Sequence, residues 1–346
     1  MKANNPHKAR KRGCSTAVLS RVGALIMTHV TQHEVLRGMA KGSTGQWRRR
    51  KWAVGVDLTE RLYTMGVDRR IRPPADGGGD AGIEVTGLTK RYLTPKGETF
   101  TAIRDVTLSV EPGQFCSIVG PTGCGKSTTL AQVSGLERPS EGSVRVGGNT
   151  VDGVTDGVSY MFQADALFPW KSVLSNVMMG PILLGTPKRE ATLLARDWLR
   201  RVGLAGFEDR YPHQLSGGMR KRVAMAAALI NNPRILLMDE PFGALDVQTK
   251  AIMQNELLKL WEELRPSVLF ITHDLDEAVA LSDRVVIMTS SPGTVKDVFD
   301  IDLPRPRGNV QQIRHEERFL ELQGQIWESL KDEVTRAYAR SAGAAA

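Results

Sequence analysis

The feature that most constrains the fold is a glycine-rich loop between a buried strand and a helix pattern. Residues 120–127 are Gly-Pro-Thr-Gly-Cys-Gly-Lys-Ser and match the phosphate-binding pattern G-x-x-x-x-G-K-[ST]. The glycines let the backbone turn so that successive N–H groups point at phosphate oxygens, and the following helix adds the positive end of its dipole. The apolar run 115–119 directly before the loop supplies the strand. Pattern and context together predict a phosphate site at a strand end.

Apolar runs of strand length recur after residue 83. Five continuous runs are typical of the buried strands of a parallel sheet. They are Phe115–Val119, Val158–Phe162, Ile235–Met238, Val268–Ile271 and Val285–Met288. Residues 106–110 alternate apolar and polar side chains, which predicts a half-buried strand. Helix patterns lie between the runs, over 187–201 with a cap and a first-turn proline at Thr186 and Pro187, and over 248–264. Strands that alternate with helices predict an α/β fold.

Two carboxylates end one of these strands, because the run 235–238 is followed by Asp239 and Glu240. Beside a phosphate loop, Asp239 can hold Mg²⁺ through water, and Glu240 can polarise an attacking water. Within the loop, we expect Lys126 to reach the β and γ phosphates and the Ser127 hydroxyl to bind Mg²⁺. Together these groups supply what in-line phosphoryl transfer to water requires.

Charge divides the chain into regions. Residues 1–80 hold 16 Lys and Arg against 6 Asp and Glu, whereas the other 266 residues hold 30 against 32. The part with strand and helix patterns is therefore close to neutral, and it predicts no nucleic-acid groove. The Pro- and Gly-rich stretch 73–79 favours a boundary near residue 80. We expect residues 1–80 to be a basic, disordered extension; a start codon placed too far upstream and a targeting peptide are the alternatives.

The cysteines and the apolar content bear on the compartment. Cys14, Cys116 and Cys124 are an odd number without metal-ligand spacing, which is typical of a reducing cytosol and predicts no disulfide framework. We interpret Cys124 in the loop as a tolerated filler. The most membrane-like stretch, 17–30, contains Arg21 and falls short of the ~20 apolar residues of a spanning helix. Any membrane attachment is therefore expected to come from a partner.

A third motif provides a resemblance to a known family. Residues 215–219, Leu-Ser-Gly-Gly-Met, lie just before a helix pattern and 90 residues after Lys126. The order of motifs resembles the ABC ATPase family over residues 83–300: phosphate loop, Gln163, signature, Asp239-Glu240, Ala244-Leu245-Asp246 and His273. The resemblance implies a P-loop NTPase core of ABC type with an antiparallel β subdomain and a helical subdomain that carries the signature. We expect an ATPase domain at 81–300 and a tail at 301–346.

The resemblance also implies how ATP is held. Ser216 and the N–H groups of Gly217 and Gly218 lie at a helix start, where they can bind a γ-phosphate. In the family this second grip acts across a dimer, so each ATP is expected between the phosphate loop of one subunit and the signature of the other. One set of motifs then requires a homodimer or a related paired subunit.

Further residues are carried over by position. Tyr92 resembles the aromatic residue that stacks on adenine. Gln163 resembles the residue that contacts Mg²⁺ and the lytic water, and His273 resembles the switch histidine that holds the γ-phosphate and helps orient Glu240. The implied catalytic residues are Glu240 and His273, and the implied Mg²⁺ ligands are Ser127, Gln163 and Asp239. The implied ATP contacts are Tyr92, Gly120, Pro121, Thr122, Gly123, Cys124, Gly125, Lys126, Ser127, Thr128, Gln163, Ser216, Gly217, Gly218 and Asp246.

Softer features indicate a branch of the family. The stretches 167–173, 176–177, 241–246 and 301–307 resemble importers of the nitrate, sulfonate and taurine group. Met219 stands where the wider family mostly has Gln and is interpreted as a branch marker, and Lys221 stands where Gln is frequent. The implied function is the ATP-hydrolysing subunit of an importer for a small organic or inorganic anion. The implied partners are integral membrane permease subunits and an extracytoplasmic substrate-binding protein, with this chain at the cytoplasmic face of the membrane.

The basic first 80 residues motivate two other hypotheses. One is a soluble ABC ATPase that acts on DNA or ribosomes; such family members carry long coiled-coil insertions or a second cassette, and neither is present, so no nucleic acid is expected. The other keeps the transporter and attracts residues 1–80 to anionic lipid. In the tail, apolar residues at helical spacing over 316–334 predict a packing helix. They are Phe319, Leu322, Ile326 and Leu330.

Overall fold

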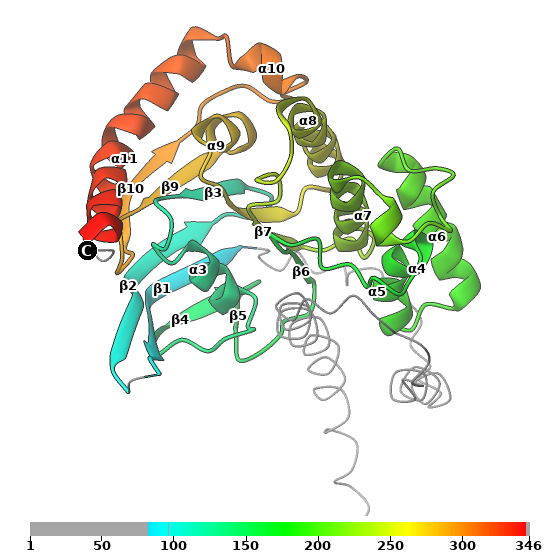
Figure 1. The fold of residues 1–346 in the computed structure, drawn as a ribbon, viewed down its shortest axis with the longest axis horizontal. Helices are drawn as coiled ribbons and strands as arrows, with labels where there is room; N and C mark the ends of the chain where they lie inside the picture. Colours follow the sequence, from blue (N-terminus) through cyan, green and yellow to red (C-terminus); the bar gives the residue numbers. More distant parts are fainter. Residues whose placement is uncertain (1–81, 96, 344–346) are drawn as a thin grey trace, which may run out of the picture. The chain divides into compact units, whose positions relative to one another are not determined.

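The computed structural model describes residues 82–95 and 97–343 (Figure 1). The extension predicted for residues 1–80 lies outside the described residues, and the boundary near residue 80 stays a prediction. Within the described chain, helices alternate with strands, as the sequence predicts for an α/β fold. Residues 181–191 belong to a different compact unit from the rest of the described chain. The rest of the described chain contains all the predicted site residues.

A six-stranded sheet carries the phosphate loop. Its strand order is β10 (Val295–Asp300), β9 (Arg284–Met288), β3 (Phe115–Val119), β8 (Ser267–Ile271), β7 (Ile235–Asp239) and β6 (Val158–Met161). All neighbours are parallel except β10, which pairs antiparallel with β9 at the edge. Every residue of β3, β7 and β8 is buried, as expected for parallel strands covered on both faces. The five apolar runs of the sequence correspond to five of these strands, so that prediction is confirmed.

A second, antiparallel sheet is the predicted β subdomain. Its order is β2 (Thr99–Val110), β1 (Ile83–Leu93), β4 (Glu141–Val146) and β5 (Asn149–Thr150). At the end of β2, Val106, Leu108 and Val110 are buried while Thr107 and Ser109 are exposed, which confirms the predicted half-buried strand. The apolar residues of β1 and β2 pack in one core with β3 and the helix after the phosphate loop. This packing places the antiparallel sheet beside the loop.

The helices complete the α/β architecture (Figure 1). They are α3 (Lys126–Val133), α4 (Val173–Val177), α5 (Met179–Leu183), α6 (Lys188–Arg201), α7 (Gly217–Leu229), α8 (Val247–Leu264), α9 (Leu275–Leu281), α10 (Val310–Ile313) and α11 (Glu317–Gly343), with a 3₁₀ turn at Pro212–Gln214. The helices between β6 and β7 include α7, which begins directly after the signature serine, as the family resemblance implies. In this part of the fold α7 packs against α4 and β6.

Side-chain caps and tail packing explain the differences from the predicted helix bounds. The Asp246 carboxylate accepts a hydrogen bond from the Thr249 N–H, so α8 begins at Val247, one residue earlier than expected. The tail helix continues nine residues past the predicted end at 334, to Gly343. It packs on α9 and β9. The four predicted contact residues are all buried: Phe319, Leu322, Ile326 and Leu330.

Candidate active site

The phosphate loop lies at the carboxyl end of β3, between the ends of β8 and β9. Its backbone needs glycine at two positions, because Gly123 and Gly125 have φ of 79° and 98°. At Gly125 a Cβ would also lie 2.2 Å from Cγ2 of Ile103 on β2. The antiparallel sheet therefore presses on the loop from one side, and a side chain at residue 125 would push the two apart.

Lys126 lies inside the loop. Its side chain is buried, and Nζ donates to the carbonyl oxygens of Gly120 at 2.9 Å and Pro121 at 3.1 Å. The Cys124 thiol is buried beside it, and burial raises the pKa of that thiol, so it stays neutral. The ammonium group is thus the positive charge that the loop presents to phosphate oxygens.

Ser127 and Asp239 come together at the ends of β3 and β7. The Ser127 hydroxyl donates to Oδ1 of Asp239 at 3.0 Å, and the Tyr160 hydroxyl lies 3.4 Å from Oδ2. Burial, aided by the neighbouring charge of Glu240, raises the pKa of Asp239 against the opposing effect of these hydrogen bonds. One hydroxyl and one carboxylate, completed by phosphate oxygens and water, fit Mg²⁺, which takes one or two carboxylates at nucleotide sites. The described residues contain no metal cage of three or more His, Cys, Asp or Glu side chains.

Glu240 joins two other predicted residues. Its Oε2 accepts a hydrogen bond from Nε2 of Gln163 at 3.3 Å and lies 3.2 Å from Nδ1 of His273. The three side chains follow β6, β7 and β8, whose carboxyl ends meet at one edge of the sheet. Glu240 itself has a φ of 43°, and its N–H donates to the Ile271 carbonyl at 3.0 Å. The carboxylate can therefore accept a proton from a water held at this edge.

Polar contacts of the residues next to His273 fix the turn that carries it. The Thr272 hydroxyl donates to Oε2 of Glu277 at 2.5 Å, and Lys250 lies 2.9 Å from both Glu277 and Asp274. Burial would raise the pKa of Asp274, but the hydrogen bonds from Lys250 and the α9 backbone outweigh it and hold that pKa below its usual range. The turn that carries His273 is thus fixed by hydrogen bonds of the residues before and after it, Thr272 and Asp274.

Tyr92 lies at the end of β1, beside the start of α3. Its hydroxyl donates to Oε2 of Glu137 at 2.7 Å and also interacts with Thr128, another residue predicted to contact ATP. Burial and the Glu137 carboxylate raise the pKa of Tyr92 to about 12. The side chain is half-buried. Tyr92 and Thr128 therefore lie next to each other, although the tyrosine hydroxyl already has protein partners.

The signature lies apart from the phosphate loop within the chain. Ser216 is the N-cap of α7 and accepts from the Met219 N–H, and a Cβ on Gly218 would lie 2.5 Å from Cγ2 of Thr249. Asp246 caps the neighbouring helix α8. Among the hydrogen bonds of the described residues, none joins Ser216, Gly217 or Gly218 to the loop at 120–127. One copy of the chain therefore brings together all the predicted residues except the signature and Asp246.

Three residues at or near the site were missed by sequence reasoning. Tyr160 contacts Asp239 as described above. Asn176, which is buried, accepts from the Phe168 N–H and donates to the carbonyls of residues 168, 171 and 172. Lys221 donates to the Gln163 carbonyl. Asn176 stood in a family-like stretch, whereas Lys221 stood out as a departure from the family pattern. Their partners gave no sequence signal, because these partners are distant in sequence or are backbone groups.

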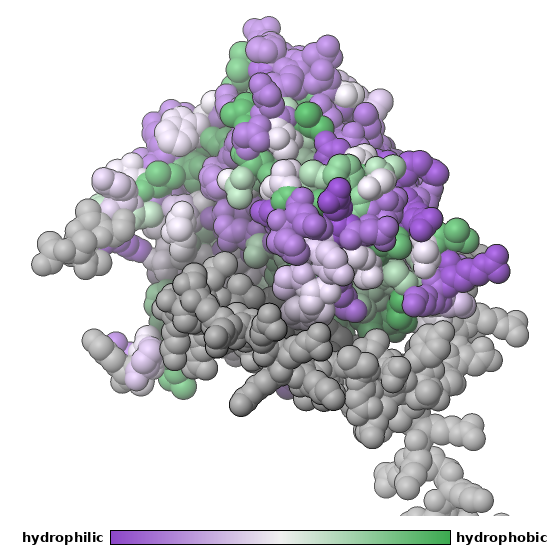
Figure 2. All heavy atoms as spheres, turned by 45° about the vertical axis from the view of Figure 1, so that its right-hand side comes forward, coloured by the Kyte–Doolittle hydropathy of each residue, from purple (hydrophilic) through white to green (hydrophobic). Residues whose placement is uncertain are grey.

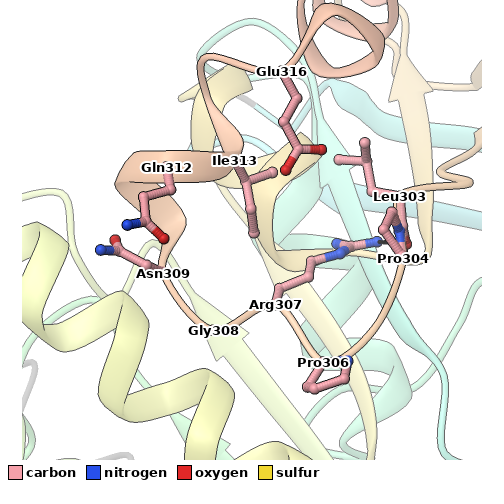
Figure 3. Close-up of a pocket in the computed structure, with 9 residues that line it drawn as sticks. All are labelled: Leu303, Pro304, Pro306, Arg307, Gly308, Asn309, Gln312, Ile313 and Glu316. Carbon is pink, nitrogen blue, oxygen red and sulfur yellow. Dashed lines mark hydrogen bonds between the residues drawn. The ribbon is translucent and has the colours of Figure 1, made fainter.

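A cavity of about 180 Å³ lies in the tail, away from these residues (Figure 3). It is lined by residues 303, 304 and 306–309 together with Gln312, Ile313 and Glu316. The Arg307 guanidinium at its wall donates to the carbonyl oxygens of Val279, Ala280, Ser282 and Leu303. Because its terminal nitrogens satisfy carbonyl groups at the carboxyl end of α9, Arg307 fastens the tail to that helix.

Comparisons with known proteins agree with this geometry. A family model described as ABC transporter matches residues 103–243. An uncharacterized ABC transporter ATP-binding protein of Methanocaldococcus jannaschii is 46% identical over 255 residues, which cover 74% of this chain and 93% of that protein. The chain belongs to the ABC transporter family.

Relatives of this ABC protein include named importer subunits. The nitrate import ATP-binding protein NrtD of Synechocystis sp. is 39% identical, with 73% of this chain and 96% of that protein covered. The aliphatic sulfonates import ATP-binding protein SsuB of Bacillus cereus is 37% identical, with 68% and 92% covered. A solved dimeric structure of the ATP-binding cassette MJ0796, in a post-hydrolysis state bound to ADP and Pi, is 31% identical with a TM-score of 0.58, and covers 64% of this chain and 100% of that chain.

The family, the fold and the ATPase activity expected from the motifs are therefore confirmed. This ABC protein is an ATPase whose cofactors are ATP and Mg²⁺. Of the helices that the structure describes, none combines the length and the apolar content that crossing a bilayer requires. The roles of the individual site residues stay predictions.

Proposed function

We propose that this ABC ATPase energises the import of a small organic or inorganic anion of the nitrate, sulfonate or taurine kind. The observation that carries the proposal is the meeting of Gln163, Glu240 and His273 at one edge of the sheet, next to the Ser127–Asp239 pair. Such a site hydrolyses a nucleotide, and the relatives named for nitrate and aliphatic sulfonate import supply the direction of transport and the class of substrate.

Each group in the site has a distinct task in this proposal. The loop N–H groups and Lys126 bind the phosphates, while Ser127 and Asp239 hold Mg²⁺, with Gln163 beside them. Bound Mg²⁺ supplies positive charge that stabilises the transferring phosphoryl group. Glu240 accepts the proton of the attacking water, and His273 keeps the Glu240 carboxylate in position.

The second phosphate grip comes from another copy or a related subunit. Ser216 lies at the start of α7, where N–H groups are free to bind an anion, and it makes no hydrogen bond to the loop among the described residues. A dimer in which ATP lies between the loop of one subunit and the signature of the other uses both grips. The dimeric ADP- and Pi-bound cassette among the solved structures supports this arrangement.

The segment after Gln163 is the proposed contact to permease subunits. Asn176 holds its backbone at residues 168–172, while Trp170 within it is 61% exposed. Figure 2 shows that hydrophobic residues are scattered among hydrophilic ones on the face that it draws. A single exposed tryptophan on a fixed loop suits insertion into a partner protein. We place the chain at the cytoplasmic face of the membrane, with an extracytoplasmic substrate-binding protein as a further partner.

The decisive experiment replaces Glu240 by Gln. We expect ATP hydrolysis to fall by a factor on the order of 10² to 10³ while Mg²⁺–ATP binding persists, because only the proton acceptor is removed. Glu328→Gln on α11, an exposed position, is the matched control and should keep the parental rate. A fully active Glu240→Gln variant would refute the assigned role.

The transport part is tested with the complex that co-purifies with the chain. Reconstituted into vesicles, it should take up nitrate or a sulfonate with ATP, and the Glu240→Gln complex should not. Recovery of nucleic acid and no integral membrane protein would instead support the soluble ABC ATPase hypothesis.

A further inference from the structure

Asp165, two residues after Gln163, is bound by two cations from the signature helix α7. Nε of Arg220 donates to Oδ2 of Asp165 at 2.8 Å, and Nζ of Lys221 lies 3.2 Å from Oδ1. The Lys221 side chain is only 4% exposed. A buried ammonium group persists only where it is paired and hydrogen-bonded, so Asp165 is the counter-charge that keeps Lys221 at this position.

Lys221 also acts directly on the backbone of the predicted site residue. Its Nζ donates to the carbonyl oxygen of Gln163 at 2.6 Å, while the Gln163 side chain reaches Glu240 at 3.3 Å. Main chain and side chain of one residue are thus held by two different elements, α7 and the end of β7. Rotation of the peptide that follows residue 163 would break the first contact.

The backbone directly after the pair is strained. Ala166 has a φ of 49°, a conformation that costs an L residue roughly 1–2 kcal/mol. Such a conformation persists only where surrounding contacts over-determine it. The two ion pairs on Asp165 are such contacts, because they fix the residue immediately before the bend.

We propose that Lys221 and Asp165 are a positioning pair that aims Gln163 at Glu240. The inference rests on the role proposed above for Gln163. Because Lys221 lies on the helix that Ser216 begins, the pair also links the signature, which serves one nucleotide, to Gln163, which serves the other. The phosphate loop makes no hydrogen bond to Lys221 or Asp165 among the described residues, so we expect the loop to keep its grip on the phosphates when the pair is removed.

The test compares Lys221→Met, Asp165→Asn and the double variant in the full-length chain. We expect each single change to lower kcat about tenfold, while KM for Mg²⁺–ATP and ATP binding in EDTA stay within about twofold. The double variant should be no slower than the slower single variant, because both changes break one unit. Lys331→Met, which breaks an exposed ion pair on α11, is the control and should match the parent.

Several results would contradict the proposed positioning role of Lys221 and Asp165. These are a Lys221→Met kcat within twofold of the parent, losses that multiply in the double variant, or a fall in ATP binding that parallels the fall in kcat. If Lys221→Met does not fold, Asp165→Asn alone decides, since the Asp165 side chain is partly exposed and tolerates an amide. A Gln163→Ala variant measured in parallel separates the role of Gln163 from the role of the pair. A parental kcat of Gln163→Ala contradicts the role of Gln163 itself. A low kcat of Gln163→Ala together with a parental kcat of Lys221→Met contradicts only the role of the pair.

Discussion

At the scale of single residues, the site holds charges and backbone angles that folding alone would avoid. Asp239 is buried, and burial together with the adjacent Glu240 charge raises its pKa. Glu240 adopts a φ of 43°, which a non-glycine residue rarely does. Both features are costly in the free protein and useful with a ligand, because Mg²⁺ needs the Asp239 charge and the turn at Glu240 aims its carboxylate at Gln163 and His273.

Replacing Asp239 by Asn should therefore stabilise the free protein and abolish its activity. The amide keeps the shape and an acceptor for the Ser127 hydroxyl, while the buried charge disappears. We expect the free energy of unfolding to rise by about 1 kcal/mol, which for a domain of this size raises Tm by about 2–4 °C. Mg²⁺-dependent ATP hydrolysis should fall below detection. Calorimetry without nucleotide and an ATPase assay measure both effects, and a lower Tm would contradict the explanation.

The raised pKa of Asp239 also predicts a pH dependence. Its folded-state pKa lies above the ordinary value, so the folded chain takes up this proton at a higher pH than the unfolded chain does. As pH falls through the raised pKa, the free protein gains stability from this group while its Mg²⁺ affinity declines. Titration of Mg²⁺ at several pH values in the presence of ATP should show the decline, and the Asp239→Asn variant should show no such pH-dependent step.

At the scale of elements, strand ends and helix starts place the reactive groups. Strands β6, β7 and β8 were recognisable as apolar runs, and the groups that follow them meet because parallel strands end at one edge. The sequence could not show what fixes the turn after β8. There Asp274 caps α9 by accepting from the N–H groups of Asp276 and Glu277, and it also pairs with Lys250.

Asp274→Ala should test this turn. Loss of the cap should lower the free energy of unfolding by about 1 kcal/mol at pH 7. The folded-state pKa of Asp274 is depressed, so its contribution is present above the ordinary pKa and is lost as pH falls through the depressed value. The stability difference between parent and variant should therefore shrink under acid conditions, as followed by urea unfolding at each pH. Asp197→Ala, in an exposed ion pair with Arg200, is the control and should change little.

At the scale of the whole molecule, the proposed function assigns one copy two halves of two different sites. The loop with Lys126 and the signature with Ser216 share no hydrogen bond within the described chain, which is consistent with a site completed by a second subunit. Helix α7 carries Ser216 at its start and Lys221 one turn later, which connects the two half-sites through a single element. This arrangement makes the subunits interdependent.

Mixing two defective variants should reveal that dependence. In a Glu240→Gln background, Lys126→Ala removes the loop grip and Ser216→Arg blocks the signature. Neither variant alone should dimerise with Mg²⁺–ATP, whereas their mixture should form dimers with about one ATP each, because one of the two shared sites is intact. Size-exclusion chromatography with nucleotide quantification measures this. Dimers formed equally by each variant alone would contradict the shared site.

The sequence by itself determined the local chemistry: the loop that only glycine can form, the strands that apolar runs encode, the helix start at the signature residue Ser216, and the order of motifs that names the family. Only the tertiary structure decided which groups meet across long separations. Lys221 holds Gln163 and Asp165, and Tyr160 contacts Asp239, although nothing in the spacing of these residues indicates it. The physical reason is that helix and strand patterns depend on residues that are neighbours in the sequence. A buried charge or hydroxyl, in contrast, is compensated by whichever partner the packed elements bring within hydrogen-bond distance.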